Sequence, residues 1–195
     1  MHALLRGALN LTYLFALGCW GGAVVFLIGI STPTTFGQLD RDAAARVLGS
    51  VFPRFFALSL ICICLALAVA VLRLWWGTAP RRVAATSVVL LSLALALVVY
   101  VMVALLPEMA RAQAQVGSFV TTPTDAPARL AYGRLHGQSM IVNAVAALLG
   151  GATLILAACN PTLLTWPPRG AQPEVAPDRA TAQRAARTIG DLPSR

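Results

Sequence analysis

Charged residues are scarce in this sequence of 195 residues, and lysine is absent altogether. Only 11% of the residues are charged, whereas about a quarter are charged in an average soluble domain. The net charge of +8 comes from scattered arginines, without the basic stripe interleaved with aromatic residues that binds nucleic acid. The composition therefore excludes a soluble domain and a nucleic-acid partner, and anionic lipid headgroups are the expected counter-charge.

Sequence motifs of several enzyme classes are missing as well. The chain contains no HExxH zinc motif, no Walker loop and no GxSxG nucleophile motif. Its apolar stretches hold no paired carboxylates, and a haem ligated by two histidines would have to use His2 as the second ligand. We therefore predict no enzymatic activity, and the sequence assigns no cofactor.

What the sequence has in abundance is long apolar stretches. Hydrophobic residues make up 58% of the chain, and four stretches, 8–30, 55–76, 83–106 and 138–159, are each longer than the roughly 20 residues that cross a bilayer. They predict an all-α membrane protein, a bundle of four transmembrane helices within residues 1–160. Residues 161–195 are rich in proline, alanine and arginine, and we expect them to form a disordered cytoplasmic tail.

The N-terminal apolar stretch follows Arg6, as in a secretory signal, but it continues to Ile30 and is too long for a signal core. We therefore expect an uncleaved first helix. Arginines in the tight 77–82 turn favour the cytoplasm for both termini. Exclusive use of arginine, together with abundant alanine, indicates a GC-rich bacterial genome, so we place the protein in the bacterial inner membrane as a multi-pass protein.

A repeated pattern divides the chain into two tandem helical hairpins. Pro33 is expected to end the first apolar helix, and Pro107 the third. An Ala/Arg-rich segment follows each proline, and 49–53 or 133–137 then leads into the next apolar helix. Asp40 is a suitable N-cap for a short amphipathic helix at the membrane interface, although a plain solvent-side connection is an alternative.

Four polar or aromatic side chains of the fourth helix share one face, because Tyr132, His136, Ser139 and Asn143 follow at spacings of four, three and four. Asn143 lies about 10 Å further along the axis than His136, within the hydrocarbon, where an unpaired amide is costly. A tandem repeat brings the first and third loops to one membrane face, so that Phe52 and Pro53 approach His136. Hydrogen-bonding between helices is the alternative role of Ser139 and Asn143.

Other side chains extend this candidate ligand-binding site. His136 is a candidate proton acceptor, metal ligand or ligand-binding group, or an inert interfacial residue. Arg54 and Arg134 are candidates to hold an anionic headgroup or substrate, with snorkelling as the alternative and Glu108 as a partner for either. A copper ion held by His136, Met140 and Met109 is chemically allowed, although Met140 one turn from His136 also suits plain packing.

The sequence resembles a known family in several short motifs: Pro33-Thr-Thr-Phe36, Gly49-Ser-Val-Phe52-Pro53-Arg-Phe55-Phe56, Pro107, and Leu135-His136-Gly-Gln-Ser139-Met-Ile-Val-Asn143. They are similar to the transmembrane-protein-205-like domain of unknown function, over residues 8–160. Tyr132 stands where that family often has phenylalanine. The resemblance implies a four-span integral membrane protein and assigns no activity, cofactor or substrate.

Three functional hypotheses follow. The leading one is a non-enzymatic membrane protein that binds or passes a small solute, ion or lipid headgroup at the face formed by the first and third loops. The second is a metal- or haem-dependent redox or metal-handling subunit, and the third is a membrane scaffold for a partner protein. Membrane lipids are the expected partners, and a homo-oligomer or a membrane-protein partner remains open.

Overall fold

The computed structural model describes residues 2–77 and 79–160, with side chains from residue 4 onward. These residues form helices, with no β-strand among them. The elements are α1 (His2–Phe26), the π-helical segment η1 (Leu27–Ser31), α2 (Thr32–Gln38), α3 (Arg41–Trp76), α4 (Arg81–Tyr100), the π-helical segment η2 (Val101–Leu105), α5 (Leu106–Val116) and α6 (Pro127–Ala158). The predicted all-α class is confirmed.

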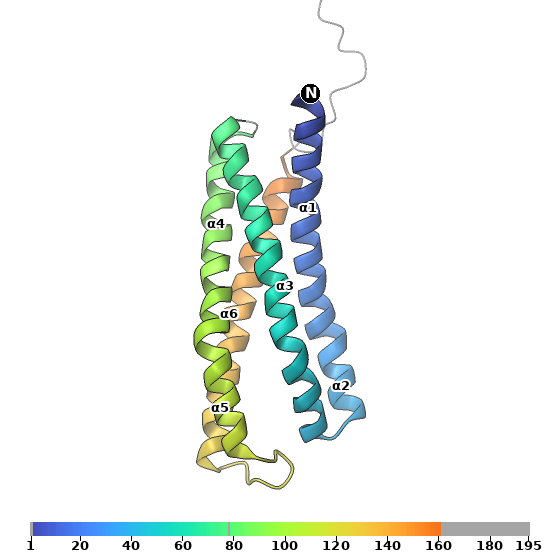
Figure 1. The fold of residues 1–195 in the computed structure, drawn as a ribbon, viewed down its shortest axis with the longest axis vertical. Helices are drawn as coiled ribbons and strands as arrows, with labels where there is room; N and C mark the ends of the chain where they lie inside the picture. The colour runs from blue at the N-terminus through green and yellow to red at the C-terminus, as the bar shows by residue number, and fades with distance from the viewer. Residues whose placement is uncertain (1, 78, 161–195) are drawn as a thin grey trace, which may run out of the picture. The chain divides into compact units, whose positions relative to one another are not determined.

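The elements combine into four transmembrane helices, because η1 joins α1 to α2 and η2 joins α4 to α5 without a break (Figure 1). We number them first (α1, η1, α2), second (α3), third (α4, η2, α5) and fourth (α6). The candidate membrane spans within them are Leu4–Gln38, Arg41–Trp76, Arg81–Val116 and Pro127–Ala158, which contain 35, 36, 36 and 32 residues and are long and apolar enough to cross a membrane. This defines a multi-pass membrane protein built from two tandem helical hairpins, as predicted.

The four helices close into a bundle because each contacts more than one other. α3 packs against α1 and α4, while α6 packs against α4, α5 and α1. The side chains most deeply buried between them include Tyr13, Ile63, Leu91, Val101 and Thr153. We call the end of the bundle with the 39–40 and 117–126 connections the loop end, and the end with the start of α1 and the α3–α4 turn the terminus end (Figure 1).

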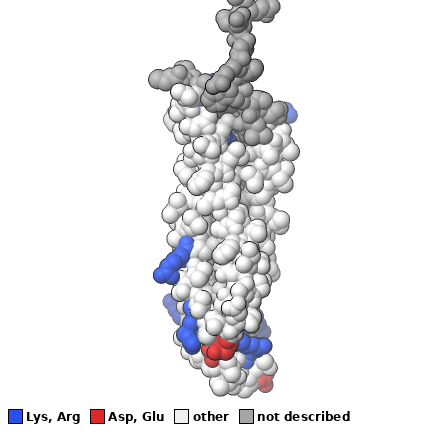
Figure 2. Space-filling model, turned by 90° about the vertical axis from the view of Figure 1, so that its right-hand side faces the viewer, with Lys and Arg blue, Asp and Glu red and all other residues white. Residues whose placement is uncertain are grey.

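At about 1.5 Å per residue, helices of this length reach roughly 50 Å, well beyond a hydrocarbon core of about 30 Å. The excess length projects from the bilayer. Figure 2 shows charged side chains gathered towards the loop end on one face of the bundle, with a long uncharged stretch beside them. The loop end therefore extends into the polar interface or beyond it.

The expectation that Pro33 and Pro107 end their helices is wrong. Each proline follows a π-helical segment by two residues, and the helix continues past it. In the π turns the backbone N–H of Thr32 donates to Leu27 O, and that of Leu106 donates to Val101 O. Proline lacks an N–H and crowds the carbonyl four residues earlier, and the wider π turn accommodates this defect without ending the helix.

The first connection is also shorter than expected, and it holds no separate helix. Only residues 39–40 separate α2 from α3. Asp40 is the predicted N-cap, accepting a hydrogen bond of 2.8 Å from the Ala43 N–H, but the helix that it caps is α3 itself, which passes through Pro53 and reaches Trp76. The fourth helix likewise begins at Pro127, well before residue 138.

Candidate functional site

The bundle encloses a cavity of about 340 Å³ that all four transmembrane helices line. Leu27 and Ile28 of η1 and Val101 of η2 contribute to its wall, so the cavity lies at the level of both π-helical segments. π turns inside α-helices are often found at functional sites. The volume falls within the range of about 300–1,000 Å³ that small-molecule pockets occupy.

Part of the helix face that the sequence predicted on α6, the face of Tyr132, His136, Ser139 and Asn143, lines this cavity. His136, Ser139 and Asn143 are in its wall, together with Met140 from the same helix and Phe52 from α3. The structure thus places Phe52 of the second helix and the polar face of the fourth helix around the same cavity. Whether these residues bind a ligand stays a prediction.

Four of the predicted site residues are not in the cavity wall. Tyr132 lies beside His136, and Pro53 and Arg54 lie on α3 next to Phe52. The Arg54 guanidinium is exposed and donates to the Ser50 carbonyl one turn earlier, while Arg134 is exposed on α6. Glu108 pairs with Arg111 at 2.6 Å, and not with Arg54 or Arg134.

The hydroxyl groups around the cavity are satisfied within their own helices. Ser139 donates to the His136 carbonyl at 2.8 Å, Ser59 to Phe55 at 2.9 Å, and Thr32 to Leu27 at 2.8 Å. Such bonds to a carbonyl one turn earlier are common for serine and threonine in helices. These side chains therefore add little free hydrogen-bonding capacity to the wall.

Two other polar groups of the wall lack a partner among the described residues. His136 Nδ1 is buried and has no hydrogen bond, and the Asn143 amide makes none with any described residue. Buried polar groups in native proteins are nearly always paired, and an unpaired group in an apolar medium is destabilising. The cavity therefore presents two groups suited to a hydrogen-bonding guest.

A chain of contacts links His136 to the second helix. The imidazole stacks on Tyr132, with ring centroids 5.9 Å apart and an interplanar angle of 6°, and Tyr132 contacts Phe119 at 5.0 Å. Phe119 N–H and Ser118 Oγ each donate to a carboxylate oxygen of Asp42 at 2.6 Å. We call Asp42, Ser118, Phe119 and Tyr132 the latch, because they fasten the 117–126 loop to α3 and hold the imidazole in place.

Sequence reasoning missed Asp42 and Phe119 because the contact joins residues 77 positions apart. It also missed Trp20, which lines the cavity and packs against Gly150 of α6. A Cβ at Gly150 would overlap the Trp20 ring, with Cη2 2.8 Å and Cε3 2.9 Å away. The glycine pair 150–151 in an apolar helix was the available signal, because small residues let transmembrane helices approach closely.

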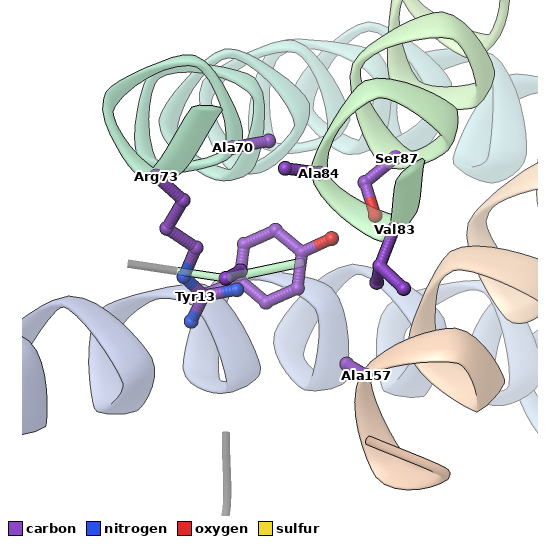
Figure 3. A pocket seen from close by; sticks show the side chains of 8 residues that line it. Tyr13, Ala70, Arg73, Val83, Ala84, Ser87 and Ala157 are labelled. Atoms are coloured by element: carbon purple, nitrogen blue, oxygen red, sulfur yellow. The ribbon is translucent and has the colours of Figure 1, made fainter. Parts of the chain in front are cut away.

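A second polar cluster lies at the terminus end. Arg73, only 5% exposed, holds its guanidinium carbon 4.2 Å above the Tyr13 ring, and Nη2 donates to Asn10 Oδ1 at 2.7 Å. Figure 3 shows this pair beside a cavity of about 10 Å³, with the Tyr13 hydroxyl pointing towards Ser87. No carboxylate among the described residues pairs with Arg73. The ring and the C-terminal turn of α3 offset its charge instead.

The donor set for a metal ion is limited. Within residues 2–77 and 79–160, no group of three or more His, Cys, Asp or Glu side chains is placed to hold a metal. His136, Met109 and Met140 nevertheless line the same cavity. An imidazole with two thioethers suits a soft ion such as Cu(I), but not a hard ion such as Mg²⁺.

Fold and cavity together define a four-helix multi-pass membrane protein with an internal pocket. Residues 15–118, more than half of the chain, match the family described as Domain of unknown function (DUF4149), and the chain belongs to this family. No curated protein and no solved structure matches it. The likeness to the transmembrane-protein-205-like domain is not confirmed. The match ends before α6, so His136, Ser139 and Asn143 lie outside it.

Proposed function

We propose that this protein is a non-enzymatic membrane protein that binds or passes a small solute, ion or lipid headgroup at its loop end. The observation that supports this function is the cavity of about 340 Å³, in which His136 Nδ1 and the Asn143 amide lack partners among the described residues. Stable bundles fill such space with side chains, because unfilled volume reduces stability. A cavity kept open around two polar groups is suited to a guest.

The setting of this function is part of the proposal. We place the protein in the bacterial inner membrane with both termini in the cytoplasm, with lipids as partners and a homo-oligomer or a membrane-protein partner still open. The four-span domain 1–160 carries the site, and the proposed disordered tail, 161–195, lies outside the described residues. Relationship to the transmembrane-protein-205-like domain remains a proposal that rests on the short motifs around Phe52 and His136.

Mass spectrometry of co-purified small molecules tests the proposed function. Wild-type protein in mild detergent is expected to retain a guest in stoichiometric amount, and His136→Ala and Asn143→Ala are expected to lose it. Gln138→Ala is the matched control, because Gln138 is exposed on the same helix. Identical small-molecule content in all four proteins would count against the cavity as a binding site. Loss of a protein partner on deletion of 161–195 alone would favour the scaffold hypothesis.

A metal-handling role is the second candidate, because His136, Met109 and Met140 line one cavity. We propose Cu(I) as the ion, and the redox variant of this hypothesis is a haem that His136 would help to hold. Elemental analysis and visible absorption of wild type beside His136→Ala and Met140→Leu separate these cases. Protein that takes up no stoichiometric copper or chromophore under reducing conditions would rule out this role.

A further inference from the structure

No charged residue belongs to the cavity wall, whose side chains are all among the described residues. An ion that moves from water into such a site meets no opposite charge, so nothing in the wall offsets the free energy that its desolvation costs. Histidine is the single ionisable side chain of the wall that titrates near neutral pH. Within the proposed function, the wall therefore selects against ions and charged headgroups and in favour of an uncharged guest.

Most of the cavity wall is apolar, which sets the character of the guest's body. Phe52, Phe55 and Phe56 line one side as a cluster, with Phe55 and Phe56 ring centroids 5.3 Å apart. Trp20 and the aliphatic residues of η1 and η2 line other parts. Such a wall stabilises apolar surface by roughly 25 cal/mol for each Å² removed from water.

The mouth of the cavity can be located from residues that both line it and are exposed. Ile28 of η1 is 62% exposed and Met140 of α6 is 59% exposed, and Ala144 of α6 is exposed as well. The cavity therefore opens sideways between the first and fourth helices. All three side chains at the mouth lack charge and belong to segments long and apolar enough to cross a membrane. A guest that enters here comes from the lipid phase and is itself soluble in lipid.

The polar end of the guest is set by His136 Nδ1. This nitrogen accepts a hydrogen bond in one neutral tautomer and donates one in the other, and the stack on Tyr132 fixes the plane of the ring. A hydroxyl group is able to donate and to accept, so it satisfies Nδ1 in either tautomer. The Asn143 amide, about 10 Å deeper along α6, remains available to a second polar atom or to water.

We propose that the cavity binds an uncharged, mainly apolar, lipid-soluble molecule through a hydroxyl group that hydrogen-bonds to His136 Nδ1. This inference rests on the proposed function and specifies its ligand class. It departs from the broader proposal by excluding ions and charged lipid headgroups as guests of the cavity.

Fluorine NMR of the full chain, labelled with 5-fluorotryptophan in lipid nanodiscs, tests this ligand class. Trp20 lines the cavity, whereas Trp75 and Trp76 are 82% and 52% exposed on α3 and report general partitioning into the bilayer. Trp20→Phe assigns the reporter signal. The probes are 1-decanol, decane, decanoate and decylammonium, which share one chain length and differ in the polar group. Their concentrations are expressed per lipid.

We expect 1-decanol to shift the Trp20 signal saturably and to bind about fivefold more tightly than decane, as one net hydrogen bond provides. His136→Phe retains an aromatic ring for the stack on Tyr132 and removes the nitrogens, so the preference for decanol over decane should vanish in this variant. Gln138→Ala should retain the preference. Decanoate and decylammonium should leave Trp20 unshifted.

The remaining outcomes separate failure of this inference from failure of the proposed function. Saturable binding of decanoate or decylammonium that needs His136 would overturn the uncharged ligand class and leave the cavity a binding site. Decanol binding unchanged in His136→Phe would overturn the hydrogen bond alone. If no probe shifts Trp20, or if Trp20 moves only in step with Trp75 and Trp76, both the inference and the proposed function fail.

Discussion

The two ends of the bundle bury polar groups in opposite ways. At the terminus end, Arg73 and Tyr13 border a cavity of only about 10 Å³, which has room for one water molecule. In the part of the bundle between its middle and the loop end, the wall of the second cavity holds no charge and surrounds about 340 Å³. One end packs a cation against its own side chains, and the other leaves space beside two neutral polar groups. The two ends therefore differ in the space beside their buried polar groups, and we propose a structural role for those groups at the first end and a binding role at the second.

The largest effect is expected at the terminus end, from Arg73→Ala. The substitution removes the cation over the Tyr13 ring and the hydrogen bond to Asn10, which together contribute about 3 kcal/mol. Thermal unfolding in lipid nanodiscs measures the loss. Arg81→Ala is the control, since Arg81 is exposed at the same end, and it should change the free energy of unfolding by less than about 0.5 kcal/mol. Equal stability of the two variants would contradict a structural role for Arg73.

Gly150→Ala should be the next most damaging change. The new Cβ overlaps the buried Trp20 ring, and overpacking of this kind destabilises by about 1–3 kcal/mol. Because Trp20 also lines the loop-end cavity, its displacement should alter tryptophan emission and weaken decanol binding. Gly151→Ala is a matched control, since a Cβ there meets nothing within 4 Å. Similar emission and binding in both variants would show that the Trp20 contact does not shape the cavity.

The contact between Trp20 and Gly150 is an example of a feature that could not be predicted from the sequence. Four apolar stretches were enough to predict four transmembrane helices and two hairpins, because length and hydropathy are local properties. In the first helix, however, apolar side chains occur all around the axis, and periodicity cannot tell which of them face the interior. Trp20 could be recognised as part of the cavity wall only in three dimensions.

On α6, by contrast, polar residues interrupt the apolar surface. The spacing of His136, Ser139 and Asn143 is local, so the sequence placed all three on one face, and the structure puts that face on the cavity. The proline expectation failed for a different reason: the rule assumes α-helical hydrogen bonding throughout, and the π turns before Pro33 and Pro107 depart from it.

Asn143→Leu should separate stability from binding at the loop end. Leucine fills part of the cavity and removes an amide that has no partner among the described residues, so we expect the protein to gain about 1 kcal/mol of stability. The same variant should lose the co-purified guest, in keeping with the common trade-off between stability and function. Thermal unfolding and mass spectrometry measure the two effects. Destabilisation by leucine would instead favour the role of Asn143 as a hydrogen bond between helices.

Because Asp42 belongs to the latch, we expect Asp42→Asn to have a smaller effect, confined to the 117–126 loop. The carboxylate accepts hydrogen bonds from Ser118 Oγ and Phe119 N–H, and an amide of the same shape keeps only one acceptor oxygen. Hydrogen exchange at Phe119 and in the 117–126 loop should accelerate, while exchange in α4 stays unchanged. Asp125→Asn is the control, because Asp125 is exposed in the same loop. Equal exchange in both variants would argue that Asp42 does not hold the loop.

The smallest effect is expected for Glu108→Gln, which breaks the ion pair with Arg111 at the surface of the loop end. The side chains are 55% and 71% exposed, and exposed pairs contribute about 0–1 kcal/mol because water and salt screen them. Unfolding in low salt should therefore differ from wild type by less than about 0.5 kcal/mol, and the difference should disappear in high salt. Decanol binding should not change, since neither residue lines the cavity. A large effect on decanol binding would mean that surface charge controls binding in the cavity. If binding does not change, the uncharged cavity wall is what determines it.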